Sequence, residues 1–102
     1  HLINRPIMPG ILQSEAMQQS IVSLLYLDAK YKHFDILIFT SKNTFFSEIN
    51  GSKSLKIISN IKEIKENFIK ARSVIKIKNK IMSKGEFTFI VVKNKKSQLD
   101  AK

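Results

Sequence analysis

Two prolines and a glycine stand ahead of a long apolar-rich segment, and this junction constrains the fold of the 102-residue chain more than any other feature. Pro6 and Pro9 stiffen the approach, and Pro9-Gly10 opens a segment that continues to about Leu27. Proline suits the entry to a helix, because its missing N–H would have no partner there, and glycine lets another group come close to the backbone. We predict a helix from this point, whose first N–H groups can hold an oxygen with negative charge.

Glu15 is the first acidic residue of the chain and lies one turn inside the predicted helix. Leu12, Gln19 and Val22 stand three, four and seven positions away, so Glu15 shares a face with apolar neighbours and an amide. A carboxyl group on such a face loses hydration, and we expect its pKa to rise, as it does in many functional sites. The simpler interpretation is a partly exposed glutamate at the edge of an ordinary amphipathic helix.

The residues around this junction form a recognisable pattern. His1 precedes Glu15 by fourteen positions, with Arg5-Pro-Ile-Met-Pro-Gly10 between them and Glu15-Ala-Met-Gln-Gln19 after them. This pattern resembles the active-site segment of the β-hydroxyacyl-acyl-carrier-protein dehydratases, the FabZ-type, hotdog-fold enzymes of fatty-acid synthesis. Leu2-Ile3-Asn4 departs from the family, which has Phe-Pro-Gly at these positions.

The resemblance implies an α+β hotdog fold, in which an antiparallel sheet wraps one long central helix. It also implies dehydration of a (3R)-3-hydroxyacyl thioester to a trans-2-enoyl thioester, without metal or cofactor. His1 would be the base, and Glu15 would hold the hydroxyl group or water. Gly10 would polarise the thioester carbonyl through its N–H, and Gln19 would hydrogen-bond Glu15. The family further implies a homodimer or higher homo-oligomer, in which the histidine and the acid of one site come from different subunits.

Composition limits the other possibilities. A chain of 102 residues with 43% apolar residues is enough for one small domain with a core. The absence of cysteine excludes disulfides and thiolate chemistry, and no run reaches the length of a membrane span, so we expect a cytoplasmic protein. The net charge of +10 predicts an acidic partner. The resemblance makes acyl carrier protein the expected partner, and we do not expect nucleic acid. The alternative is a lysine-rich composition spread over solvated faces without a partner.

The chain opens on His1 without an initiator methionine, so we expect a fragment or a processed segment. Members of the family carry a further segment ahead of the histidine, which includes an edge hairpin of the sheet. We therefore predict an N-terminally incomplete hotdog domain over residues 1–93 and a polar tail over residues 94–102.

The middle of the chain predicts strands. Residues 34–40 are rich in β-branched and aromatic side chains and indicate a strand buried on both faces. We expect a turn at residues 41–43, a second short strand over residues 44–49, and a turn at Asn50-Gly51. The family carries Pro-Gly-Asp near this last turn, in a loop that borders its acyl tunnel, whereas this chain has Asn50-Gly51-Ser52.

Residues 54–78 allow two interpretations. The apolar residues from Leu55 to Ala71 recur every three to four positions, as in an amphipathic helix, but residues 69–78 alternate as in a half-exposed strand. The resemblance favours two long antiparallel strands with a turn near residues 65–67. We then expect a turn at Asn79-Lys80 and a last strand over residues 81–92, with a bend or hairpin tip near residues 83–85.

Two other functions remain open at this point. A hotdog thioesterase, or a non-catalytic acyl-thioester-binding relative, would keep the fold and Glu15; the altered histidine loop and the missing Pro-Gly-Asp favour it. A basic module that binds nucleic acid or a membrane surface would use residues 54–78 as a lysine-faced helix.

Overall fold

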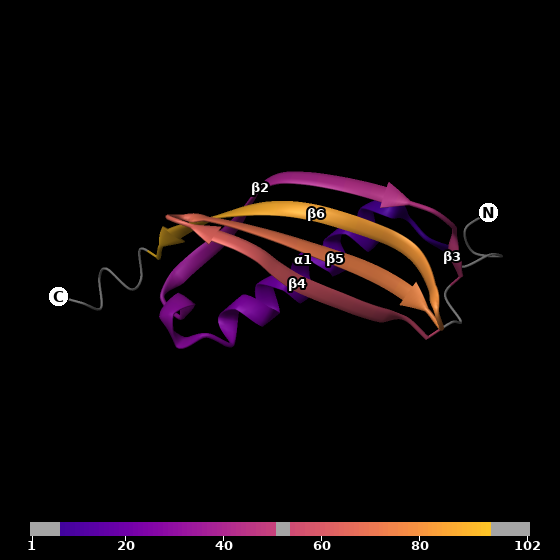
Figure 1. The fold of residues 1–102 in the computed structure, drawn as a ribbon, viewed down its shortest axis with the longest axis horizontal. Helices are drawn as coiled ribbons and strands as arrows, with labels where there is room; N and C mark the ends of the chain where they lie inside the picture. Colours follow the sequence, from indigo (N-terminus) through magenta and orange to yellow (C-terminus); the bar gives the residue numbers. More distant parts are fainter. Residues whose placement is uncertain (1–6, 51–53, 95–102) are drawn as a thin grey trace.

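The structure is a computed structural model, and it describes residues 7–50 and 54–94. One long helix packs against a four-stranded antiparallel sheet, with a small two-stranded pairing beside the start of the helix. The elements in chain order are β1 (Ile7–Met8), α1 (Gly10–Tyr26), the short 3-10 helix η1 (Ala29–Tyr31), β2 (Phe34–Phe45), β3 (Ile49–Asn50), β4 (Lys56–Lys65), β5 (Phe68–Ile77) and β6 (Lys80–Lys93). Figure 1 shows α1 lying along one face of the long strands.

The helix forms where the sequence predicts it. Pro9 is the N-cap residue with extended backbone angles, and the helix then runs for seventeen residues. One stripe of α1, repeating every four residues, faces the sheet and is buried: Gln13, Met17, Ile21 and Leu25. On the sheet side, the buried core includes Ile69, Ala71, Ile75, Phe87 and Phe89.

A chain of serine hydroxyls crosses the interface between helix and sheet. The Oγ atoms of Ser20 on α1 and Ser59 on β4 lie 2.9 Å apart, and those of Ser59 and Ser73 on β5 also lie 2.9 Å apart. Ser73 is fully buried, so its hydroxyl depends on this contact in place of water. The first bond therefore ties α1 to β4, and the second joins β4 to β5.

The sheet has the strand order β2-β6-β5-β4, with every pair antiparallel. The prediction of two strands within residues 54–78 is confirmed, with the turn at Glu66-Asn67; the helical interpretation of this segment is wrong. The next turn lies at Lys78-Asn79, one residue earlier than expected. β6 continues through residues 83–85 without a hairpin tip, and its pairing with β5 shifts register at Met82.

Strand β2 differs from its prediction in length and in burial. It runs from Phe34 through Phe45, so residues 41–43 continue the strand and form no turn. They pair with β6, where Asn43 lies opposite Gly85. The separate strand expected over residues 44–49 is also wrong, because residues 44 and 45 end β2 while Ile49–Asn50 pair with β1. β2 is an edge strand and is mostly exposed, not buried on both faces. The predicted turn at Gly51 lies outside the described residues.

Gly85 provides the space in which β2 and β6 meet. A Cβ atom at this position would lie 2.5 Å from Phe87 Cζ and 2.9 Å from Asn43 Oδ1. Phe87 is buried in the core, so its ring cannot move outward to make room. We expect Gly85→Ala to lower the free energy of unfolding by about 1–3 kcal/mol through overpacking. Urea unfolding measures this, with the exposed neighbour Lys84→Ala as a control that should change stability by less than about 0.5 kcal/mol. Equal stability of the two variants would contradict the packing argument.

Candidate active site

The start of α1 carries backbone donors without helical partners. The Pro9 carbonyl accepts hydrogen bonds from the N–H groups of Leu12 and Gln13, each at 3.1 Å. No side chain caps this end of the helix. The N–H groups of Gly10 and Ile11 belong to the first turn and have no acceptor inside the helix. The helix start therefore has the donor geometry that the sequence predicts for Gly10.

A hollow of about 380 Å³ lies beside these donors. It is lined by the helix start and by the segment that follows β2: Pro9, Gly10, Gln13, Phe45, Phe46, Ser47 and Glu48. The Phe45 ring packs against Gly10, so closely that a Cβ atom on Gly10 would lie 3.2 Å from two ring carbons. The hollow thus combines backbone donors with two aromatic rings, which suits an acyl chain that ends in a polar carbonyl.

Backbone hydrogen bonds hold the outer wall of the hollow in place. The N–H groups of Phe46 and Ser47 donate to the Met82 carbonyl, at 2.8 and 3.3 Å. Met82 is the residue at which β6 shifts register against β5. On the other side, Met8 pairs with Ile49, which ties the approach to α1 to the same segment. Strand pairing therefore positions the backbone of this wall.

Glu15 and Gln19 lie side by side on the outward face of α1. The Gln19 amide Nε2 donates to Glu15 Oε1 at 3.3 Å, so the hydrogen bond expected between them is present. Both side chains are exposed, and the loss of hydration predicted for Glu15 is absent in this chain. The reason is helix geometry, since Glu15 is two residues, or about 200°, away from the buried position of Gln13.

The structure brings together some of the predicted site residues and leaves others apart. Gly10 lines the hollow, whereas Glu15 and Gln19 are absent from its lining. His1 lies outside the described residues. Within residues 7–50 and 54–94, no group of three or more histidine, aspartate or glutamate side chains could hold a metal ion. No helix of this part of the chain has the length and apolar character of a membrane span.

Sequence reasoning missed Gln13 as a residue of the hollow. Gln13 is only 3% exposed to solvent, and it lines the hollow. The repeat of Gln13 with Met17 and Ile21 at four-residue spacing is the signal that could have placed it on the inner face. Phe45 and Phe46 also line the hollow, and the packing of the Phe45 ring on Gly10 joins residues far apart in the sequence, so no local pattern predicts it.

Comparison with known proteins gives two curated sequence relatives, and no family model matches the chain. The 3-hydroxyacyl-acyl-carrier-protein dehydratase FabZ of Syntrophomonas wolfei is 32% identical over 90 residues, which are 87% of this chain and 62% of that protein. The FabZ of Rickettsia canadensis is 29% identical over 93 residues, which are 89% of this chain and 65% of that protein. The chain thus spans less than two thirds of the length of these relatives.

Two solved structures show the fold that this chain shares. A hot-dog-like protein from Thermanaerovibrio acidaminovorans superposes with a TM-score of 0.75 at 14% identity, over 93% of this chain and 70% of that chain. A gentisyl-coenzyme A thioesterase superposes with a TM-score of 0.73 at 13% identity, over 87% and 77%. Similarity at such low identity concerns the fold alone, and it confirms the predicted α+β hotdog arrangement.

The contact between Gly10 and Phe45 can be measured by a double-mutant cycle. We expect Gly10→Val to destabilise the protein by about 1–3 kcal/mol, because its side chain must displace the Phe45 ring. In a Phe45→Ala background this cost should shrink, which gives a coupling energy of about 0.5 kcal/mol or more in urea unfolding. Leu12→Val, at an exposed position of the same turn, reports the cost of a β-branched residue alone. An equal cost of Gly10→Val in both backgrounds would show that the ring does not limit this position.

Proposed function

We propose that this chain, which is similar in sequence to the FabZ dehydratases, takes part in the reversible dehydration of a (3R)-3-hydroxyacyl thioester to a trans-2-enoyl thioester. The observation that carries the proposal is the helix start, where the Pro-Ile-Met-Pro-Gly segment leads into α1 at Gly10. On this helix, Glu15 is hydrogen-bonded to Gln19 one turn further on, as the resemblance implies. The hollow beside Gly10 has the aromatic lining that an acyl chain needs.

The proposed reaction needs a base, an acid and donors for a developing negative charge. His1, whose ordinary pKa is near neutral, would take the proton from the carbon next to the carbonyl. The Gly10 N–H would donate to the thioester oxygen while enolate charge develops there. Glu15 would hold the departing hydroxyl group and deliver the proton with which it leaves as water. Gln19 would keep the Glu15 carboxylate in position.

We further propose that two chains complete each site. Glu15 lies on the outward face of α1, close in sequence to Ile11 and Leu12, which are both strongly exposed. A second chain over this apolar face would remove water from Glu15 and bring its own histidine loop near, as the family arrangement implies. This accounts for an acidic site residue that is exposed in a single chain.

Acyl carrier protein is the proposed carrier of the substrate. The net charge of +10 favours association with an acidic carrier. The two sequence relatives are named for this carrier-linked substrate. The reaction would accordingly take place in the cytoplasm, where the carrier presents its acyl thioester.

A thioesterase, or a non-catalytic acyl-thioester-binding protein, is the second candidate. The fold is shared with a gentisyl-coenzyme A thioesterase, and Asn50-Gly51-Ser52 stands where the dehydratases carry Pro-Gly-Asp. The two reactions differ in their products, because hydrolysis releases a free thiol and dehydration does not. A thiol reagent in the assay therefore separates the two activities.

The first test is hydration of a short trans-2-enoyl thioester, followed by loss of enoyl absorbance. We expect Glu15→Gln to lower kcat/KM by about 10²- to 10⁴-fold, because the amide cannot accept the proton of the attacking water, which is the reverse of proton delivery in dehydration. Glu63→Gln, an exposed carboxylate on β4 at the other side of the sheet, is the matched control and should keep kcat/KM within about twofold. Hydration that survives in Glu15→Gln would overturn the assignment, and release of thiol without hydration would favour the thioesterase.

The second test concerns Gln19 as a positioning residue. Gln19→Leu keeps the size of the side chain but removes the amide that donates to Glu15. If Gln19 serves the substrate site through Glu15, we expect kcat to fall by about tenfold with KM nearly unchanged. Gln18→Leu, which breaks the neighbouring bond of Gln18 to Ser14 at 3.2 Å, is the control and should leave kcat unchanged. Equal effects of both variants would mean that Gln19 acts only through helix stability.

A further inference from the structure

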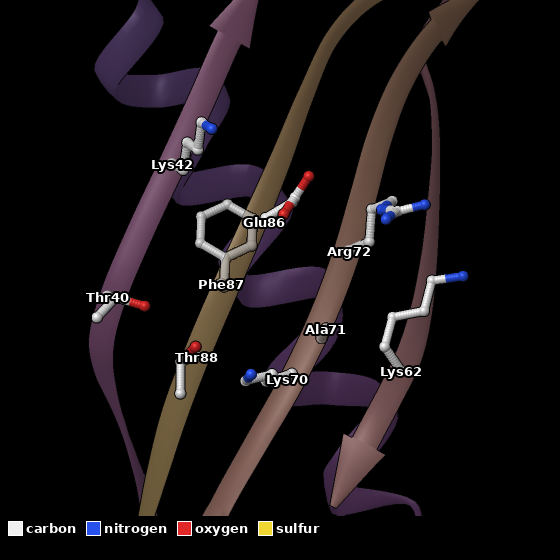
Figure 2. A pocket seen from close by; sticks show the side chains of 9 residues that line it. All are labelled: Thr40, Lys42, Lys62, Lys70, Ala71, Arg72, Glu86, Phe87 and Thr88. Atoms are coloured by element: carbon white, nitrogen blue, oxygen red, sulfur yellow. The ribbon is translucent and has the colours of Figure 1, made fainter.

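The outer face of the sheet, turned away from α1, carries a basic hollow. Along β5, Ile69, Ala71 and Ser73 are buried on the α1 side, while Lys70 and Arg72 alternate with them on the outer side. The hollow has a volume of about 400 Å³ and spans all four strands of the sheet. Figure 2 shows the side chains that line it: Thr40, Lys42, Lys62, Lys70, Ala71, Arg72, Glu86, Phe87 and Thr88.

Cations outnumber carboxylates in this hollow. Its lining contains three lysines and one arginine but only one acidic residue, Glu86. Strand register places Glu86 between Lys42 on β2 and Arg72 on β5, so a single carboxylate lies beside two cationic residues. Lys70 lies 4.0 Å from Glu63, but both side chains are more than half exposed, and such a pair is weak. The hollow therefore has an excess of cationic side chains that can bind an external anion.

Hydroxyl groups and aromatic rings surround these cations. Thr40 on β2 lies opposite Thr88 on β6, and Thr88 lies opposite Lys70 on β5. Two threonines and a lysine therefore form a row across three strands. At the next positions the rings of Phe39 and Phe68 meet edge to face, with centroids 5.5 Å apart. These rings are 61% and 40% exposed. Phe68 stands two residues from Lys70 on the same face of β5, a spacing of roughly 7 Å.

We propose that this outer face binds a short single strand of nucleic acid. Lysine and arginine neutralise phosphates, threonine hydroxyls donate to phosphate oxygens, and exposed rings on a sheet accept unstacked bases. A spacing of roughly 7 Å between cation and ring suits one phosphate and its base. An acidic peptide would leave the two rings without a stacking partner, and a flat lipid surface would not reach into the hollow. The activity goes beyond the proposed dehydration and reverses the expectation that nucleic acid is no partner.

The test is fluorescence anisotropy of labelled oligouridylate and oligothymidylate of about 12 nucleotides, a length within the range of single-strand binding sites. With three to four phosphates neutralised, affinity should fall about 20- to 50-fold between roughly 50 and 200 mM salt. Lys70→Gln combined with Arg72→Gln should weaken binding by more than about tenfold and flatten this salt dependence. Lys78→Gln with Lys80→Gln, at the exposed turn between β5 and β6, removes the same charge elsewhere and should have little effect.

The aromatic pair is tested by Phe39→Leu with Phe68→Leu, which keeps apolar packing but removes the rings. Affinity should fall while the salt dependence stays, because stacking releases no counterions. Leu27→Ala, a strongly exposed position at the end of α1, is the control. Unfolding in urea verifies that each variant is folded.

Several outcomes would overturn the proposal. Equal losses in the Lys70–Arg72 and Lys78–Lys80 double variants would mean attraction by net charge alone. Unchanged affinity after removal of both rings would mean general polyanion binding. Binding to vesicles that contain phosphatidylglycerol, with no binding of either oligonucleotide, would assign the face to a lipid surface. Hydration of the enoyl thioester is measured separately, so failure of either proposal leaves the other standing.

Discussion

The burial of one stripe of α1 against the inner face of the sheet is the interaction on which the rest of the structure depends. Met17 and Ile21 are completely buried there, and each contributes about 1.5–3 kcal/mol by leaving water. Apolar burial alone would let the helix slide along the strands, because it has no direction. The hydrogen bond between Ser20 and Ser59 supplies direction, since it requires a particular rotation and height of the helix, and Ser73 in turn hydrogen-bonds Ser59. The hollow at the helix start exists because this placement is fixed.

Local signals in the sequence predict much of the fold. Pro9 marks the helix start through chain geometry, and the alternation within residues 69–77 agrees with β5, even though the helical period competes in the preceding residues. The length of strand β2 cannot be predicted from local signals. Ser41 to Asn43 have turn propensity, but their pairing with β6 and the space above Gly85 hold them in extended form. The Phe87 ring lies against Gly85, and both residues are more than 40 positions from Asn43 along the chain. No local sequence pattern therefore predicts this packing.

The candidate site divides along the same line. The bond between Gln19 and Glu15 joins residues four positions apart on one helix, so the spacing predicts a shared face and the family resemblance implies the bond. The packing of Phe45 on Gly10 joins distant residues and could not be predicted from spacing. The exposure of Glu15 follows from which stripe of α1 the sheet covers. The sequence shows an apolar neighbourhood on the helix, but it does not show which of two adjacent faces meets the sheet.

The bulge at Met82 has a consequence for how this pocket can change during evolution. Its carbonyl holds the wall residues Phe46 and Ser47, while its position is set by the offset between β5 and β6. The acceptor is a backbone carbonyl, so a substitution of the buried Met82 side chain disturbs core packing without removing the acceptor. Gain or loss of one residue in the hairpin would move the anchor by a full strand step, and pocket width would change in discrete jumps. Under the proposed function, the accepted acyl-chain length would then diversify through insertions and deletions in a hairpin, with the aromatic lining unchanged.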